Sequence, residues 1–472
     1  MPDPLVGRLG SSFRDPCGFV FLDQGVLKRQ INEAYRDDYE ALTGSGLGDV
    51  LVAEGLLIPH EELGDEEARR RGTYKVIRPE PVDFISYPYE WCFGQLKDAA
   101  LATLRIQSLA LDHGMSLKDA SAFNIQFRRG RPVLIDTLSF ERLEEGRPWV
   151  AYGQFCRHFL APLALMSTRD IRLGQMSRVF LDGIPLDLAS ELLPAKSRLK
   201  LGLQIHIHSH AKSQLKHAGK GVGRDEVKGR FSMKAFRGLV DNLRAVIESI
   251  EWEPAGTEWV DYYAEATHYS EAALEVKQRL VDQFVRAVNP GTVWDLGANT
   301  GMFSLIAARH SRHTVAFDID PAAVELHYRE IKRRDERTDV LPLVLDLTNP
   351  SPALGWANRE RDSLASRSPV DLVLALALIH HLVIGNNVPF ERVAYELSRL
   401  ARSLVIEFVP KDDPKVRFML ASREDIFDRY SQDDFERAFE ARFRITSKDP
   451  VGDSGRTLYL MEASPGPHDP HR

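Results

Sequence analysis

The chain has 472 residues, of which 43% are hydrophobic and 27% charged, and its formal net charge is −7. This length predicts two or three domains, and the mixture of acidic and basic residues argues against a broad nucleic-acid-binding surface. Three cysteines, Cys17, Cys92 and Cys156, are too few for a disulfide framework, and no apolar run is long enough to span a bilayer. We therefore expect a cytoplasmic protein without a membrane partner.

Residues 1–210 predict a mixed α+β domain. Gly18–Ile31 is typical of a β-hairpin, Val82–Tyr87 of a strand and Phe93–His113 of a long helix. The segment after this helix contains three polar residues in a spaced pattern, and it is the part of the domain that suggests a chemistry of its own.

Asp119, Asn124 and Asp136 are spaced as in the catalytic segment of protein kinases and aminoglycoside phosphotransferases, which this segment resembles. The resemblance implies a kinase-like domain in which Asn124 and Asp136 hold Mg²⁺ and Lys28 or Arg29 faces the phosphates of ATP. The chain departs from these families where it lacks their glycine-rich loop, the His-Arg or His-Gly before the first Asp, and the Asp-Phe-Gly triplet. The alternative is a domain that recognises a substrate or scaffolds the second domain.

Four histidines, His206, His208, His210 and His217, stand close together near residue 210. Alternating histidines on a strand can bind a metal, but no Cys or Asp completes the set, so we expect a solvated segment that enters a linker. Residues 211–230 are basic, contain glycines and have few large apolar side chains, which predicts that linker. Residues 231–268 then predict a helical connector.

Residues 269–472 alternate short apolar runs with helical stretches, which predicts an α/β domain with a parallel sheet covered by helices. The expected strands are Thr292–Asp295, Thr314–Asp318, Leu341–Asp346, Asp371–Ala377 and Ser403–Phe408. The expected helices are Gly301–Arg309, Pro321–Arg334 and Phe390–Leu400. Phe443–Thr446 and Arg456–Met461 predict an antiparallel hairpin at the end of the domain.

The first strand of this domain runs directly into a small-residue turn, VWDLGANTG, and a helix. A strand, a glycine turn and a helix N-terminus make a site for a polar ligand. Asp295 ends the strand, Gly297 and Gly301 permit tight turning, and Asn299 tolerates left-handed backbone. Asp318 ends the next strand about 20 residues later, the distance at which an acid meets a ribose.

Asp346 ends the third strand and is placed to meet an adenine amino group, whereas Asp320 precedes Pro321 and is typical of a helix N-cap. This series of acids and glycines resembles the class I S-adenosylmethionine (AdoMet)-dependent methyltransferases. The resemblance implies a Rossmann-like, seven-stranded domain. It assigns Asp295, Gly297 and Gly301 to the methionine part of AdoMet, Asp318 to its ribose and Asp346 to its adenine region, and Tyr269 is a candidate to close over the cofactor.

Catalytic candidates follow the fourth and fifth strands, because ligands meet at the carboxyl ends of parallel strands. His380 and His381 can act as bases near neutral pH, or they pack. Glu407 at a strand end is either paired or functional, since a buried lone charge is costly. The Pro-rich loop Asn349–Trp356, with Glu360 and Arg361 after it, is a further candidate to shape the site.

The whole chain resembles bacterial methyltransferases associated with nodulation host specificity and surface glycans. This resemblance implies a sugar or small-molecule hydroxyl as the methyl acceptor. Two rival functions stay open: a bifunctional protein with ATP- and Mg²⁺-dependent phosphotransfer, and a module that binds AdoMet without catalysis.

Overall fold

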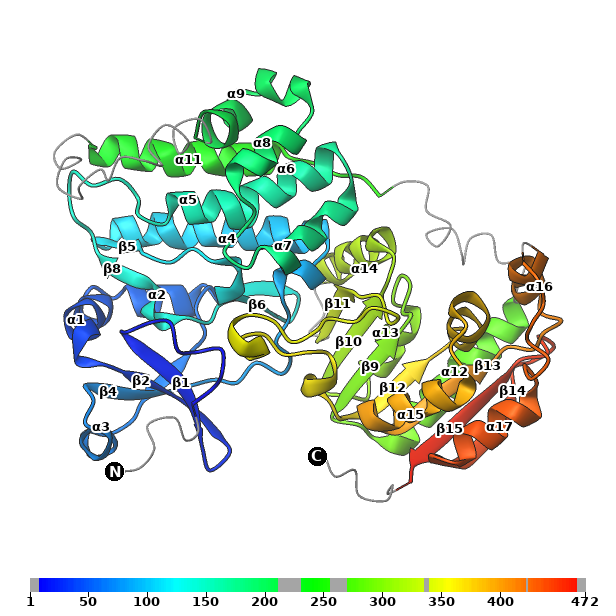
Figure 1. The fold of residues 1–472 in the computed structure, drawn as a ribbon. Helices are drawn as coiled ribbons and strands as arrows, with labels where there is room; N and C mark the ends of the chain where they lie inside the picture. The colour runs from blue at the N-terminus through cyan, green and yellow to red at the C-terminus, as the bar shows by residue number, and fades with distance from the viewer. Residues whose placement is uncertain (1–7, 211–230, 255–269, 335–338, 422, 465–472) are drawn as a thin grey trace. The chain divides into compact units, whose positions relative to one another are not determined.

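A computed structural model of the chain describes residues 8–210, 231–254, 270–334, 339–421 and 423–464 (Figure 1). The chain forms two compact units. Unit 1 comprises Met1–Glu253 together with Leu354–Arg361, and unit 2 comprises Pro254–Ala353 together with Asp362–Arg472. Within the described residues, every helix is too short or too polar to cross a membrane.

The first part of unit 1 is an antiparallel sheet with the strand order β1-β2-β4-β3. Its strands are β1 (Gly18–Asp23), β2 (Val26–Ile31), β3 (His60–Glu62) and β4 (Lys75–Pro79). Gln24 and Gly25 both have positive φ, 49° and 79°, as the type I′ turn of a tight hairpin requires. Ile31 and Ile77 are buried against Tyr35, so one face of this sheet forms a core.

Val82–Tyr87 is not a strand, contrary to the sequence-based prediction. Prolines flank the segment on both sides, and its backbone pairs with a side chain instead of a neighbouring strand. The Ser86 amide donates to Oε1 of Gln126 at 2.9 Å, and Nε2 of Gln126 donates to the Ser86 carbonyl at 2.9 Å.

The second part of unit 1 is mainly helical and is organised around α4 (Phe93–Asp112). Helix α11 (Met233–Ser249) packs on α4 and belongs to unit 1. Arg244 donates to the Ser108 hydroxyl at 2.8 Å, and four apolar residues of α11 are buried. The sequence predicts this helix as part of a connector, because its apolar face shows that it packs but not on which unit.

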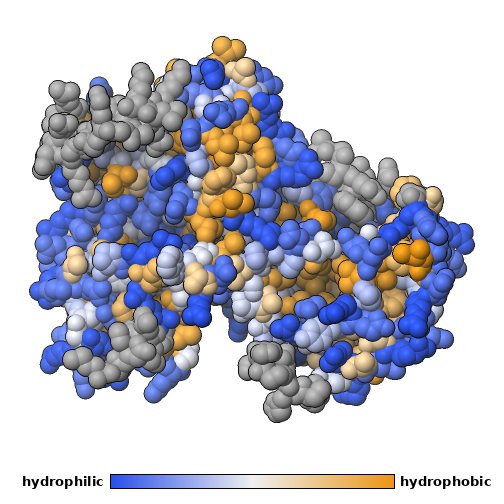
Figure 2. All heavy atoms as spheres, in the orientation of Figure 1, coloured by the Kyte–Doolittle hydropathy of each residue, from blue (hydrophilic) through white to orange (hydrophobic). Residues whose placement is uncertain are grey.

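The remaining elements of unit 1 are short. Its helices are α1 (Arg36–Gly44), α2 (Leu47–Ala53), α3 (Asp65–Arg71), α5 (Tyr152–Phe155), α6 (Ala161–Thr168), α7 (Met176–Val179), α8 (Leu186–Leu192) and α9 (Leu201–Leu203), followed by a π-helical turn η8 (Gln204–Ser209). Its remaining strands are β5 (Met115–Leu117), β6 (Ile125–Arg128), β7 (Arg131–Leu134) and β8 (Phe140–Arg142). In Figure 2, apolar side chains gather over this helical part, among hydrophilic ones.

Two of the histidines near residue 210, His206 and His208, are buried, so the prediction of a solvated segment is wrong for these two. Nδ1 of His206 accepts from the Tyr152 hydroxyl at 2.8 Å, and its Nε2 donates to Oδ1 of Asn242 at 2.7 Å. His208 lies between two serine hydroxyls, at 2.7 and 2.8 Å. Satisfied hydrogen bonds make burial of both rings possible, and they leave no ring nitrogen of either for a metal. His217 lies outside the described residues.

Unit 2 contains a seven-stranded sheet with the order β11-β10-β9-β12-β13-β15-β14. Its strands are β9 (Thr292–Leu296), β10 (His313–Asp318), β11 (Val340–Val344), β12 (Val370–Ala375), β13 (Ala401–Phe408), β14 (Phe443–Pro450) and β15 (Thr457–Ala463). The first five run parallel, and β15 is antiparallel to both β13 and β14. The expected terminal hairpin is therefore present.

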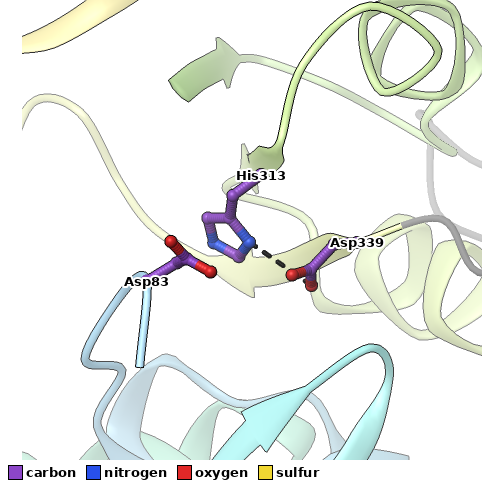
Figure 3. Close-up of side chains that lie close together, drawn as sticks. All are labelled: Asp83, His313 and Asp339. Atoms are coloured by element: carbon purple, nitrogen blue, oxygen red, sulfur yellow. Dashed lines mark ion pairs between the residues drawn. The ribbon is translucent and has the colours of Figure 1, made fainter. Parts of the chain in front are cut away.

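Helices cover this sheet (Figure 1). They are α12 (Glu271–Val288), α13 (Met302–Ala307), α14 (Pro321–Arg333), α15 (Phe390–Leu400), α16 (Pro414–Ala421) and α17 (Gln432–Glu440). At the amino ends of the strands, His313 begins β10 and its Nδ1 lies 3.3 Å from Oδ1 of Asp339, next to β11 (Figure 3). The chemistry-bearing residues predicted from the sequence stand mostly at the opposite, carboxyl ends.

Candidate functional site

A cavity of about 360 Å³ lies at the carboxyl ends of β9, β10, β11 and β12. This is the edge at which parallel α/β sheets bind ligands. Its walls come from four strand–helix connections and are formed by Gly297, Asn299, Asp318, Ile319, Leu345, Asp346, Leu347, Thr348, Leu376, Ala377, Leu378, His381, Leu382 and Asn386. The volume falls within the range of small-molecule sites.

The turn after β9 has the left-handed backbone that its residues predicted. The φ angles are 79° at Gly297, 51° at Asn299 and 84° at Gly301. A Cβ on Gly297 would lie 3.3 Å from Leu378, across the cavity wall, whereas a Cβ on Gly301 would lie 2.0 Å from the ring of His327. Gly297 and Asn299 line the cavity, while Gly301 permits the close packing of His327.

Asp318 ends β10 and lines the cavity. Its Oδ2 accepts from the Asn299 amide at 2.7 Å, and its Oδ1 accepts from the Asp320 amide at 2.9 Å. Burial raises the pKa of Asp318 to about 6, against the opposing effect of these amide donors. The predicted N-cap is confirmed, since Oδ1 of Asp320 accepts from the Ala322 amide at 2.9 Å.

Asp346 follows β11 and also lines the cavity. Its Oδ1 accepts from the amide and the hydroxyl of Thr348, at 2.8 and 2.6 Å. The local turn fixes the carboxylate and leaves Oδ2 available to a ligand donor. The two acids at the ends of neighbouring strands therefore meet at one cavity.

Asp295 stands behind the cavity and does not line it. Its Oδ2 accepts from the Ser304 hydroxyl at 2.6 Å, which connects β9 to α13. Burial raises the pKa of Asp295 to about 7. The structure thus gives Asp295 a contact within the protein, and Tyr269 lies outside the described residues.

Of the two candidate histidines, His381 lines the cavity and His380 is fully buried. Their rings lie 4.1 Å apart, centre to centre. Burial, together with His381 and nearby cations, holds the pKa of His380 well below its usual value, so its ring is neutral. Only His381 is placed to contact a ligand.

Glu407 is completely buried in β13 and is paired. Its Oε2 lies 2.7 Å from Nζ of Lys277 and accepts a hydrogen bond from the Ala377 amide at 2.7 Å. Its Oε1 lies 3.9 Å from a guanidinium nitrogen of Arg456. Because Glu407 does not line the cavity, it has no path to a substrate proton as the structure stands.

Sequence reasoning missed the apolar part of the site. Ile319 lines the cavity and remains 58% exposed, although its side chain is large and apolar. Leucines at 345, 347, 376, 378 and 382 complete the apolar walls. Each of these leucines adjoins or lies near a predicted polar site residue, so the sequence could have indicated them. An apolar residue beside a strand end is more often part of the core, however, and for that reason they were not predicted as site residues.

Unit 1 brings its own predicted residues together. Nη2 of Arg29 lies 2.5 Å from Oδ1 of Asp136, whereas Lys28 pairs with Asp23 at 2.8 Å. Arg29 is therefore the basic residue of β2 that faces this group. Asp119 accepts from the Ser121 amide at 2.9 Å, and burial, with the nearby charge of Asp136, raises its pKa.

The Pro-rich loop after β11 does not shape the cavity as its position suggested. Residues Leu354–Arg361 belong to unit 1. Glu360 pairs there with Arg14 at 2.7 Å, and the Arg361 guanidinium lies 4.2 Å from the ring centre of Phe123. The contacts of Glu360 with Arg14 and of Arg361 with Phe123 place both residues in unit 1. These partners are far away in the sequence, so the residues next to the loop could not indicate them.

Comparison with known proteins identifies a relative over nearly the whole chain, although no family model matches. The nodulation protein NoeA of Rhizobium meliloti (strain 1021) is 36% identical over 470 residues, which cover 98% of this chain and 97% of that protein. The chain belongs to the NoeA family. For this NoeA-family chain, the matched residues therefore span both units.

Among solved structures, the NoeA-family chain is similar to magnesium protoporphyrin IX methyltransferase of Synechocystis, with 18% identity, 41% of this chain and 86% of that chain covered, and a TM-score of 0.30. The N-methyltransferase NodS of Bradyrhizobium japonicum has 10% identity, 41% and 98% coverage and a TM-score of 0.30. The bifunctional kinase-methyltransferase WbdD has 19% identity, 46% and 45% coverage and a TM-score of 0.30.

Proposed function

We propose that unit 2 binds AdoMet in the cavity at the carboxyl ends of β9–β12 and transfers its methyl group to an acceptor. The observation that carries the proposal is the pair of acids, Asp318 and Asp346, on neighbouring strand ends of one cavity beside the left-handed turn at Gly297. A carboxylate fixed by backbone amides suits the two hydroxyls of a ribose.

The remaining walls suit an adenosine group. Ile319, exposed beside Asp318, offers an apolar face to a base, and the leucines around it extend this apolar wall. Asp346 has Oδ2 available for an exocyclic amine. These residues fit AdoMet by the chemistry of their donors and acceptors.

AdoMet, when bound, supplies an activated methyl group, so the protein has to place the acceptor and take up its proton. His381 is the described histidine that lines the cavity, and we assign it the role of base. Glu407 and His380 are buried behind it and do not have this role. We infer a sugar or small-molecule hydroxyl as the acceptor class.

Titration calorimetry of the full chain with AdoMet and S-adenosylhomocysteine (SAH) tests the proposal. We expect both to bind, and Asp318→Ala to weaken binding by about 10- to 100-fold, the worth of hydrogen bonds to a charged group. Glu391→Ala, an exposed change on α15, is the matched control and should bind as wild type does. Failure of AdoMet to bind would end the proposal, and equal affinity of Asp318→Ala would end the site assignment.

Transfer of a labelled methyl group to sugar and small-molecule hydroxyl acceptors tests the role of His381. We expect His381→Ala to bind SAH as wild type does but to lose transfer. Binding without transfer to any acceptor by the wild-type protein would instead favour a non-catalytic AdoMet-binding module.

A second candidate function, ATP- and Mg²⁺-dependent phosphotransfer in unit 1, is supported by one observation: Asn124 and Asp136 lie with Asp119 and Arg29 in one cluster. Their side-chain oxygens are ligands that Mg²⁺ accepts, although Oδ1 of Asp136 already contacts Arg29 and the Leu138 amide. Calorimetry with ATP and Mg²⁺ decides, since this function requires Mg²⁺-dependent binding that Asp136→Ala abolishes.

A further inference from the structure

Ala377 has a backbone conformation that its side chain disfavours. It follows β12, lines the cavity and has a φ of 51°. A residue with a Cβ is disfavoured in this left-handed region, so its surroundings have to hold it there. A strained residue in the wall of a ligand cavity calls for an identified cause.

A buried carboxylate on the neighbouring strand holds the backbone amide of this residue. Strands β12 and β13 pair up to Ala375 and Ile406, and Glu407 follows directly. Its Oε2 accepts a hydrogen bond from the Ala377 amide at 2.7 Å. Since Glu407 has no exposed surface, water cannot compete for this hydrogen bond.

Two cations fix the carboxylate itself. Lys277 on α12 is 2% exposed and places Nζ 2.7 Å from the same Oε2, and Arg456 lies 3.9 Å from Oε1. Asp413 in turn lies 2.8 Å from Nε of Arg456. A compensated, hydrogen-bonded charge of this kind is held in one geometry, because every displacement would leave a buried charge without its partner.

The geometry points to Glu407 as a positioning residue of the cofactor cavity. With Lys277, it locks the Ala377 backbone and so sets how the segment 376–382, which carries Leu378 and His381, forms the cavity wall. The position of this segment also affects the opposite wall of the cavity, because Leu378 lies close to Gly297. This inference rests on the proposed function, and it replaces the role of catalytic base that the sequence suggested for Glu407.

Two paired variants separate the hydrogen bond from the charge. Lys277→Met with Glu407→Gln removes both charges but keeps an acceptor for the Ala377 amide. Lys277→Met with Glu407→Met removes the acceptor as well. We expect SAH affinity within about threefold of wild type for the first pair and about tenfold weaker for the second, the factor that corresponds to the left-handed penalty.

Adding Ala377→Gly to the second pair is the decisive step. Glycine adopts φ near 51° without the Cβ penalty, so this triple variant should recover most of the lost affinity. A structural defect elsewhere would not be repaired by this change. Equal affinity of the two pairs, or no recovery in the triple variant, would overturn the inference.

Hydrogen exchange of the Ala377 amide, without ligand, gives a readout that does not depend on AdoMet. We expect this amide to be strongly protected in the wild type and in the Gln pair, and to exchange faster in the Met pair. Rapid exchange in the wild type overturns the inference even if the Met pair fails to fold. If the wild type does not bind SAH but its Ala377 amide is protected, the proposed function fails and the positioning contact stands.

Discussion

Replacing Lys277 with Met should strongly destabilise unit 2, because it leaves Glu407 buried without its nearest countercharge. Removing one partner of a buried ion pair costs about 3–5 kcal/mol. Arg456 remains 3.9 Å from the carboxylate, so we expect the lower end, about 3 kcal/mol. For a unit of this size, that corresponds to a Tm lowered by about 6–12 °C.

Differential scanning calorimetry of the full chain measures the effect. The unfolding transition of unit 2 is the one that SAH shifts upward, since ligand binding stabilises the unit that binds it. The control is Arg286→Met on the same helix. Its ion pair with Asp282 has the same 2.7 Å separation, but the two side chains are 68% and 25% exposed.

The control pair should contribute under about 1 kcal/mol, because water screens exposed charges. Lys277→Met combined with Glu407→Gln should recover most of the lost stability, since no buried charge is then left alone. If Lys277→Met lowers the Tm no more than Arg286→Met does, the buried pair is not the contact we describe.

Three further predictions concern other parts of the molecule. SAH affinity should rise from pH 5 to pH 7 with an inflection near pH 6, because the pKa of Asp318 is raised to about 6 and only the deprotonated carboxylate accepts hydrogen bonds from both ribose hydroxyls. In calorimetry, Asp318→Asn should lack this inflection. A wild-type affinity that does not change with pH would contradict the assignment. Gly301→Ala, whose Cβ would lie 2.0 Å from His327, should lower the Tm of unit 2 far more than Gly455→Ala, which shares a positive φ but has its nearest neighbour at 3.7 Å; similar losses would mean that backbone conformation alone matters. His208→Ala should cost unit 1 about 1–3 kcal/mol, because it leaves the hydroxyls of buried Ser197 and half-buried Ser190 without their partner, and it should not change SAH affinity. A chelator that destabilises the wild type equally would reveal a metal instead.

The sheet of unit 2 could be predicted because the sequence encodes it locally. Its parallel strands are rich in apolar residues, and β10 and β11 lead into polar residues, Asp318 and Asp346, whose positions the sequence pattern predicts. The carboxyl ends of parallel strands share one edge of the sheet. Two acids far apart in the chain could therefore be assigned to one site.

The contacts that decide roles inside the site could not be predicted in this way. Lys277 and Glu407 are 130 residues apart, and nothing local in either segment indicates the other. The same holds for His206, whose burial depends on the Asn242 amide of a helix that the sequence assigned to a connector. Pairing of buried polar groups is a property of the packed molecule, so the sequence could state that Glu407 is paired or functional but not which.

The insertion of Leu354–Arg361 in unit 1 has a practical consequence for dissecting the molecule. The chain passes from unit 1 to unit 2 after Glu253, returns for eight residues and leaves again, so no single cut separates the two units. A fragment that ends at Glu253 would lose Glu360 from its contact with Arg14, and Arg361 from Phe123. A matching C-terminal fragment would carry those two residues without their partners. Independent expression of unit 1 therefore requires that residues 354–361 be joined to residues 1–253, and expression of unit 2 requires that a short linker replace residues 354–361. Full-length protein is the proper material for the experiments above.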